Sequence, residues 1–301
     1  MTHHTNAFMA LLVVSHFATA SSAAAQQDLV ASGTQIRKLA GGFTFTEGPA
    51  VDAQGNIYFS DIPNSRIHKW SLEGGLSTFR EDTEQANGLF FASDGTLLAC
   101  QSREGRRLVQ YGPRGAVTPI VATYQGKRFN SCNDLWPDPQ GGIYFTDPRY
   151  GRKRDDMEQD GEHVYYLQPD RKTLIRVIDD MVRPNGIIGT PDGKTLYVAD
   201  HGAGKTYAYR IRTDGRLADK RLVANRGSDG VTLDERGNLY LTTGAIYIHG
   251  PDGKELGSIS VPERPANCCF GGRSGKTLFI TAQTSLYSIE MEVKGAYVPS
   301  P

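Results

Sequence analysis

Asp138-Pro-Gln-Gly-Gly-Ile-Tyr-Phe-Thr-Asp147 is the stretch that decides the fold, because it joins a turn to a strand and recurs along the chain. Its first glycine suits the positive φ of a hairpin turn, and its Ile-Tyr-Phe run favours a β-strand. Five further segments repeat the pattern of a turn glycine followed by apolar or aromatic residues. They are residues 52–61, 93–100, 192–200, 234–242 and 274–281.

The spacing of these copies predicts the architecture. The six turn glycines are Gly55, Gly95, Gly141, Gly193, Gly237 and Gly275, with a mean separation of 44 residues. A period of about 40 to 50 residues is typical of one four-stranded propeller blade. We therefore predict an all-β, six-bladed β-propeller with blades from Gly48 to about Tyr287, inside a domain of residues 26–301. Residues 35–40 are expected to close the ring as the outer strand of the last blade, because an open ring would leave a bare sheet edge.

The N-terminal region resembles an export signal. Residues 8–14 are apolar, and residues 23–25 are all alanine, as at a cleavage site before Gln26. The first Lys or Arg is Arg37, so the usual basic start is missing, and a membrane-tethered N-terminus is the alternative. We expect residues 1–25 to be a signal peptide and the mature chain, without a membrane span, to be periplasmic or secreted.

Charge and cysteine content narrow the classes of function. Lys plus Arg and Asp plus Glu number 33 each in the 301 residues, so the net charge is zero and no basic field predicts nucleic-acid binding. The four cysteines permit several disulfide pairings, although buried thiols are the simpler expectation. They are Cys100, Cys132, Cys268 and Cys269.

Charged residues 152–161 form a long loop that is either a lid or an ordinary solvated loop.

A ring of polar residues appears eight positions before each turn glycine. Its members are Glu47, Asn87, Asn133, Asn185, Asp229 and Asn267. A constant offset places each at the same point of its blade, so the six oxygen-bearing side chains should converge at one mouth of the central tunnel. Such hard ligands suit Ca²⁺, with Mg²⁺, Mn²⁺ or Zn²⁺ as alternatives. Asn-Gly and Asp-Gly are also common turn dipeptides, which is the competing interpretation.

At these positions the chain resembles the SMP-30/gluconolactonase/luciferin-regenerating-enzyme family of calcium-dependent propellers. The matching motifs are Thr46-Glu-Gly-Pro49, Asn130-Ser-Cys-Asn-Asp134, Arg183-Pro-Asn-Gly186 and Ser228-Asp-Gly230. The resemblance implies that Glu47, Asn133, Asn185 and Asp229 are the metal ligands. It leaves Asn87 and Asn267 in supporting roles.

The resemblance also implies hydrolysis of small sugar lactones, with the metal polarising the carbonyl group. Asp229 is then the expected general base, because it is one of only two acids in the ring; a role as ligand alone is the alternative. A phosphotriesterase-like activity on the same metal is the competing enzymatic function. A non-catalytic propeller that binds a ligand or a protein is the competing class.

Four residues near the ring in sequence are candidates for substrate contact. Arg128 and Asn130 precede the ligand Asn133, Tyr150 follows the predicted strand of the third blade, and His201 follows Asp200 at the end of another. Tyr150 is placed to stack on a sugar ring, and His201 to donate to a hydroxyl or carry a proton. Each is otherwise an ordinary loop residue, and the oligomeric state stays open.

Overall fold

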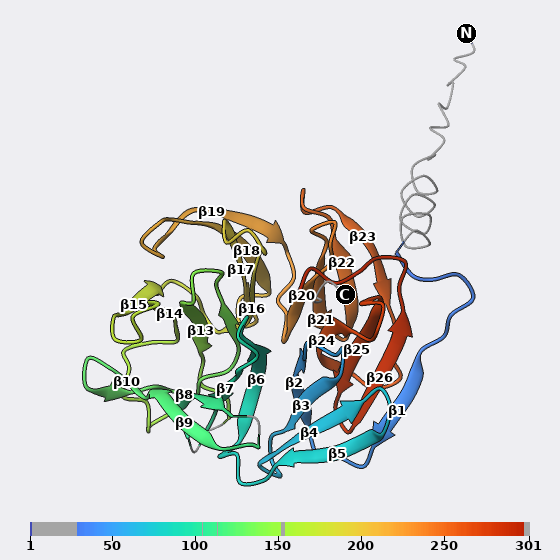
Figure 1. Cartoon of the computed structure of the whole chain (residues 1–301). Coiled ribbons are helices and arrows are strands. Elements are labelled where there is room, and N and C mark those ends of the chain that lie inside the picture. The colour runs from blue at the N-terminus through green and yellow to red at the C-terminus, as the bar shows by residue number, and fades with distance from the viewer. Residues whose placement is uncertain (2–28, 104, 113, 152–153, 298–301) are drawn as a thin grey trace.

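Six four-stranded antiparallel sheets surround a common axis in the computed structural model (Figure 1). The structure describes residues 1, 29–103, 105–112, 114–151 and 154–297. Every regular element within these ranges is a β-strand, which confirms the predicted six-bladed propeller. The predicted signal peptide lies outside the described residues apart from Met1. Within those ranges, no helix is long and apolar enough to cross a membrane.

Each blade is numbered from its innermost strand outward. Blade 1 contains β2 (Thr46–Val51), β3 (Ile57–Asp61), β4 (Arg66–Ser71) and β5 (Gly75–Arg80). Blade 2 contains β6 (Ala86–Phe91), β7 (Leu97–Gln101), β8 (Arg107–Tyr111) and β9 (Val117–Val121). Blade 3 contains β12 (Leu135–Pro137), β13 (Ile143–Asp147), β14 (His163–Leu167) and β15 (Leu174–Ile178).

The second half of the ring follows the same plan. Blade 4 contains β16 (Pro184–Gly189), β17 (Thr195–Asp200), β18 (Lys205–Ile211) and β19 (Leu217–Ala224). Blade 5 contains β20 (Val231–Leu233), β21 (Leu239–Thr243), β22 (Ala245–His249) and β23 (Glu255–Ile259). Blade 6 contains β24 (Pro265–Gly271), β25 (Thr277–Ala282), β26 (Ser285–Glu290) and β1 (Arg37–Gly41). A small hairpin of β10 (Thr123–Tyr124) and β11 (Lys127–Arg128) links blades 2 and 3.

The six turn glycines do what the sequence pattern predicts. All six have positive φ, between 69° and 92°. In the quoted stretch, the Gly141 N–H donates to the Asp138 carbonyl at 3.0 Å, and the Asp138 carboxylate accepts the N–H groups of Gln140 and Gly142. The turn residues thus satisfy the backbone between the first and second strand of the blade.

The N-terminal strand closes the ring, as expected. β1 lies antiparallel to β26, with Arg37 opposite Ser288, and it starts and ends slightly later than residues 35–40 (Figure 1). Val30 forms a further bridge with Met291. Blade 6 is therefore built from both ends of the chain. In this blade, β1 covers the outer edge of β26.

Aromatic packing within and between the sheets fills the core, and Tyr240 of blade 5 meets Phe270 of blade 6 edge-on at 5.3 Å between centroids. Trp136, Tyr144 and Tyr240 are completely buried, and the Tyr144 ring stacks on Tyr166 at 4.2 Å between centroids. All four cysteines are buried free thiols, the arrangement that the sequence favoured.

Candidate active site

The inner strands contact one another in sequence around the axis, and β24 returns to β2 to complete the circle. Glu47, Asn87 and Asn185 are the second residues of their strands, Asn267 is the third of its strand, and Asn133 and Asp229 lie two residues before theirs. Equivalent starting points in six blades bring these positions to one end of the tunnel.

The glycines that follow ring residues mark the closest approach of neighbouring blades. A Cβ atom on Gly48 would lie 2.1 Å from the Asn87 carbonyl oxygen, and one on Gly186 would lie 2.7 Å from the Asp229 carbonyl oxygen. Both glycines lie inside β-strands, so these dipeptides are not turns here. Because these two glycines have no side chain, neighbouring inner strands can approach closely, and the ring of polar residues stays narrow.

Hydrogen bonds connect the ring side chains to one another. The Asn185 Nδ2 atom donates to Asp229 Oδ1 and to the Tyr150 hydroxyl, both at 2.6 Å. With the amide nitrogen used in this way, the Asn185 carbonyl oxygen is left for a cation. On the opposite side, Glu47 Oε2 accepts the Gly48 N–H, and Asn267 Oδ1 accepts the Cys268 N–H, both at 2.8 Å.

Burial perturbs both ring carboxyls. Desolvation raises the pKa of Glu47 well above its usual value, and the negative charge of Asp229 raises it further, against a hydrogen bond from Gly48. Desolvation also raises the pKa of Asp229, whereas positive charge on His201, a hydrogen bond from Asn185 and positive charge on Arg264 oppose the rise. Burial similarly raises the pKa of Asp134, directly below the ring, to about 7. Several carboxyls are thus crowded at a point that would favour a divalent cation.

The donor set fits a hard divalent ion. The carboxylates of buried Glu47 and half-buried Asp229, together with several amide oxygens, are ligands that Ca²⁺ accepts. Within the described ranges, no cluster of three or more His, Cys, Asp or Glu side chains has the spacing of a metal site. A cation at this mouth would therefore need amide oxygens as well as carboxylates, and Asn133 and Asn185 are the ring residues that carry amides next to Asp134 and Asp229.

Two of the four predicted substrate contacts lie at the mouth. The Tyr150 hydroxyl reaches Asn185, and its ring meets the His201 ring edge-on at 6.1 Å between centroids. His201 Nδ1 is buried and has no hydrogen-bond partner among the described residues. Both side chains therefore stand beside Asp229 with polar atoms available.

The other two predicted contacts occupy different surroundings. Asn130 is completely buried, and its amide donates to the carbonyl groups of Asp147 and Gly161. Arg128 is exposed on the β10–β11 hairpin, where its Nε atom pairs with Glu158 at 2.9 Å. The recorded contacts of both residues are therefore with blade 3 and its loop, and Asn130 Oδ1 is buried without a hydrogen-bond partner among the described residues.

Three aspartates hold the loops that lead into the ring, a role that the sequence analysis missed. Asp61, Asp147 and Asp200 end the second strands of their blades. Their carboxylates accept backbone N–H groups two or three residues before a ring residue, as at Phe45, Ser131 and Arg183. The signal was present, because each aspartate closes a copy of the repeated stretch.

The long loop of blade 3 is tied to the scaffold in its described part. Asp156 pairs with Arg106 and with Arg149, and Glu158 pairs with Arg128. Residues 152 and 153 lie outside the described residues. These ion pairs fix residues 156–158 beside blades 2 and 3.

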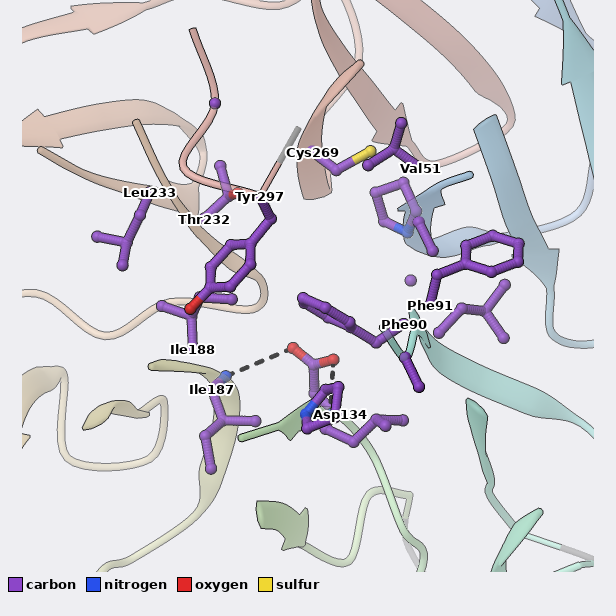
Figure 2. Close-up of a pocket in the computed structure, with 18 of the residues that line it drawn as sticks. Val51, Phe90, Phe91, Asp134, Ile187, Ile188, Thr232, Leu233, Cys269 and Tyr297 are labelled. Atoms are coloured by element: carbon purple, nitrogen blue, oxygen red, sulfur yellow. Dashed lines mark hydrogen bonds between the residues drawn. The ribbon is translucent and has the colours of Figure 1, made fainter. Parts of the chain in front are cut away.

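Below the ring, the tunnel widens into a cavity of about 460 Å³ lined mainly by apolar side chains from the inner strands. Asp134 faces this space beside Phe90 and Tyr297, and its carboxylate accepts the Ile187 N–H (Figure 2). The Tyr297 hydroxyl accepts the Trp136 indole N–H at 2.9 Å and donates to the Gly189 carbonyl. The ring thus separates a polar mouth from an apolar tunnel.

Comparison with known proteins places this geometry in context. The sequence profile described as the SMP-30/Gluconolactonase/LRE-like region matches residues 45–284. The chain is 33% identical to a gluconolactonase from Zymomonas mobilis, over 87% of this chain and 83% of that protein. It is 28% identical to a pentonolactonase from Haloferax volcanii, over 78% and 80% of the two chains.

Solved structures agree with the sequence relatives. The structure described as a gluconolactonase from Xanthomonas campestris is 31% identical and superposes with a TM-score of 0.82. The match covers 92% of this chain and 93% of that one. The likeness therefore extends over nearly the whole propeller.

Proposed function

The chain belongs to the SMP-30/gluconolactonase/LRE-like family, and on that premise we propose that it is a divalent-metal-dependent hydrolase of sugar lactones. One observation carries the proposal: the carboxyls of buried Glu47 and half-buried Asp229 lie in the ring with amide side chains, and the Asn185 amide donates to Asp229 Oδ1 at 2.6 Å. The names of the relatives support the lactone as the substrate class.

We assign the metal ligands to Glu47, Asn133, Asn185 and Asp229, with Ca²⁺ as the preferred ion because all four offer oxygen. A bound ion of this kind acts as a Lewis acid on a carbonyl oxygen. Asn267 supports the site through Glu47, whose pKa its hydrogen bond lowers. The amide of Asn185 orients Asp229 through the bond to Oδ1.

Asp229 is the proposed general base. Its Oδ1 atom is held by Asn185, which leaves Oδ2 to take the proton of an attacking water molecule. As the water oxygen bonds to the carbonyl carbon, the ester C–O bond breaks and the leaving oxygen takes a proton, giving the open hydroxy acid. Desolvation raises the pKa of Asp229 in the metal-free protein, and a bound cation would favour its ionised form, which is the form that accepts a proton.

Tyr150 is the proposed hydrogen-bond donor to the substrate. Its hydroxyl accepts the bond from Asn185, so its own proton remains available for a substrate oxygen. Burial, followed by the charge of Asp229, raises the pKa of Tyr150 and keeps the hydroxyl protonated at neutral pH. His201 stands beside it and can relay the proton to the leaving oxygen.

Two other functions compete with this one. A phosphotriesterase-like activity would use the same metal and base, since substrate choice depends on the mouth loops. A non-catalytic binding propeller would need neither the acidic pair nor the orienting bond from Asn185.

A substrate panel separates the three functions. Metal-loaded protein is assayed with aldono-1,5-lactones, simple aliphatic lactones and aryl phosphotriesters, with spontaneous ring opening subtracted. Lactonase function predicts the highest kcat/KM for aldonolactones. Faster phosphotriester turnover would favour the second function, and silence on every ester with metal bound would favour the binding propeller.

We also propose that the protein is exported, on the basis of the apolar run and alanine-rich site in residues 1–25. Mass spectrometry of the mature chain from the periplasm or medium should find an N-terminus at Gln26. Recovery of the intact chain from the cytoplasm would contradict this.

A further inference from the structure

Two arginines and two aromatic side chains line one side of the mouth. We define the mouth wall as Tyr150, Arg183, His201 and Arg264. The Arg183 guanidinium carbon lies 5.2 Å from the centroid of the Tyr150 ring, and that ring meets His201 edge-on. Arg264 is exposed on the loop that enters β24, three residues before Asn267, and its positive charge acts on Asp229. The mouth wall therefore brings side chains from blades 3, 4 and 6 near Asp229, the proposed base.

The positive charge of the wall is only partly neutralised. Arg183 pairs with Glu162 at 3.3 Å, but the same carboxylate also pairs with Arg154. The single carboxylate of Glu162 therefore neutralises only part of the charge of two guanidinium groups. No carboxylate in the described ranges forms an ion pair with Arg264. Because the net charge of the whole chain is zero, this excess is a local feature of the mouth.

The acids that face the wall do not cancel it once the proposed ion is bound. Glu47 and Asp229 are the two carboxylates that a divalent ion would neutralise. Asp134 lies on the tunnel side of the ring, where the N–H groups of Leu135 and Ile187 satisfy it. What remains beside the ring is the positive charge of Arg183, which Glu162 and the Tyr150 ring hold in place, and of exposed Arg264.

We propose that the preferred substrates are sugar lactones that carry a carboxylate or phosphate at the end remote from the carbonyl, and that Arg183 and Arg264 bind this group. The inference rests on the proposed lactonase function and names its substrate class. Guanidinium groups hold such anions through charge-assisted, often bidentate hydrogen bonds. Arg183 is especially suited, because Glu162 and the Tyr150 ring fix its orientation before the substrate arrives.

The anionic group lies away from the reacting carbonyl, so it contributes binding that is the same in the ground and transition states. The preference should therefore appear mainly in KM rather than kcat. A charge-assisted hydrogen bond corresponds to about a tenfold gain in kcat/KM or more. Added salt should reduce the gain, because the wall is partly exposed to solvent.

The test compares three lactones that differ only at carbon 6: neutral glucono-1,5-lactone, its 6-phosphate, and glucaro-1,5-lactone with a carboxylate. The two charged compounds distinguish phosphate from carboxylate as the favoured anion. Values of kcat and KM are measured for the wild type, Arg183→Gln and Arg264→Gln. Arg264→Gln is the safer variant for folding, because it breaks no ion pair. Arg210→Gln is the matched control, since Arg210 is an exposed outer-strand residue that pairs with Asp219.

The expected result is a preference of about tenfold or more for at least one charged lactone, which falls in both wall variants and persists in Arg210→Gln. Hydrolysis of the neutral lactone with no preference for either charged one would overturn the inference and leave the lactonase function intact. A preference unchanged in both wall variants would also overturn it. Failure to hydrolyse any of the three with metal bound would instead count against the lactonase function itself.

Discussion

Glu47 is buried and Asp229 is half-buried, and the hydrogen bonds of the two ring carboxyls differ. The backbone N–H of Gly48 holds Glu47, whereas a side-chain amide from the neighbouring blade holds Asp229. Asp229 also lies close to His201 and Arg264, which face the open mouth. The acid on the solvent side of the ring is therefore the one placed to exchange a proton with substrate water.

Asp229→Asn tests this division at the residue scale. The amide keeps the shape of the side chain but cannot accept a proton, so kcat should fall by about 10²- to 10⁴-fold. Thermal unfolding should change little, because the amide has the same shape and removes a half-buried, desolvated charge. Lactone kinetics beside a melting curve give the answer, and a fully active, folded variant would remove Asp229 from the base role.

Metal binding should release protons, and Glu47 should account for part of the release. Burial and mutual repulsion raise the pKa values of Glu47 and Asp229 in the metal-free protein, so they hold protons at pH values where solvated acids are ionised. A cation binds the ionised form. Its apparent affinity should therefore rise with pH until both carboxyls are deprotonated.

Calorimetry in buffers of different ionisation enthalpy measures this release directly. Glu47→Gln should weaken Ca²⁺ binding by about tenfold or more and reduce the number of protons released. Equal affinity and equal proton release in wild type and variant would show that Glu47 is not a ligand.

At the scale of single strands, the ring depends on glycines as much as on its polar side chains. Gly186 lies in β16 against the backbone of Asp229 and Gly230 in the next blade. The repeat made the ring residues predictable, because a fixed offset needs only counting. The reason for the following glycine was not predictable, because the contact joins two blades about 44 residues apart in sequence.

Gly186→Ala should therefore disturb both stability and the metal site. The new Cβ would lie 2.7 Å from the Asp229 carbonyl oxygen, and such overpacking costs about 1–3 kcal/mol. The matched control is Gly74→Ala in the β4–β5 turn, where the nearest atom is 4.0 Å away. Denaturant midpoints and Ca²⁺ affinity should fall only in the first variant; equal values in both would contradict the close-approach account.

The surroundings of the four predicted substrate-contact residues could be predicted from the sequence only in part. Tyr150 and His201 follow the ends of second strands, and antiparallel pairing returns those ends to the ring, as between Pro184 and Asp200. Asn130 and Arg128 are near Asn133 in sequence, yet the Asn130 amide bonds to the Asp147 and Gly161 carbonyl groups and Arg128 pairs with Glu158 on an exposed hairpin. Distance in sequence from a ring residue did not predict which side chains contact the ring. Position within the blade, just after the second strand, was the better guide.

At the scale of the whole molecule, stability depends on joining the two ends of the chain in blade 6. The period and the alternation of strands were enough to predict this closure, because a ring of repeats leaves an exposed edge unless a terminal segment covers it. The apolar tunnel was less accessible to prediction. Tyr297 fills its lower part through bonds to Trp136 and Gly189, and these contacts link residues over a hundred positions apart.

Removing β1 by truncation tests whether closure of blade 6 stabilises the propeller. A chain that begins at Gly42 lacks β1 and exposes the edge of β26, so it should melt at a lower temperature and aggregate more than a chain that begins at Gln26. A chain that begins at Gly33 is the control, because it loses the buried Leu29 but keeps β1. Equal stability and solubility of the Gly33 and Gly42 chains would show that β1 is dispensable.

The central claim is that one divalent ion in the six-residue ring enables this propeller to open lactones. The most direct measurement strips the protein of metal and follows glucono-1,5-lactone hydrolysis as Ca²⁺, Mg²⁺, Mn²⁺ or Zn²⁺ is titrated back. We predict no turnover above the spontaneous rate without metal, and recovery that saturates at one ion per chain, with Ca²⁺ the most effective. Undiminished hydrolysis by the stripped protein would contradict the claim, as would an inactive protein shown to hold its ion.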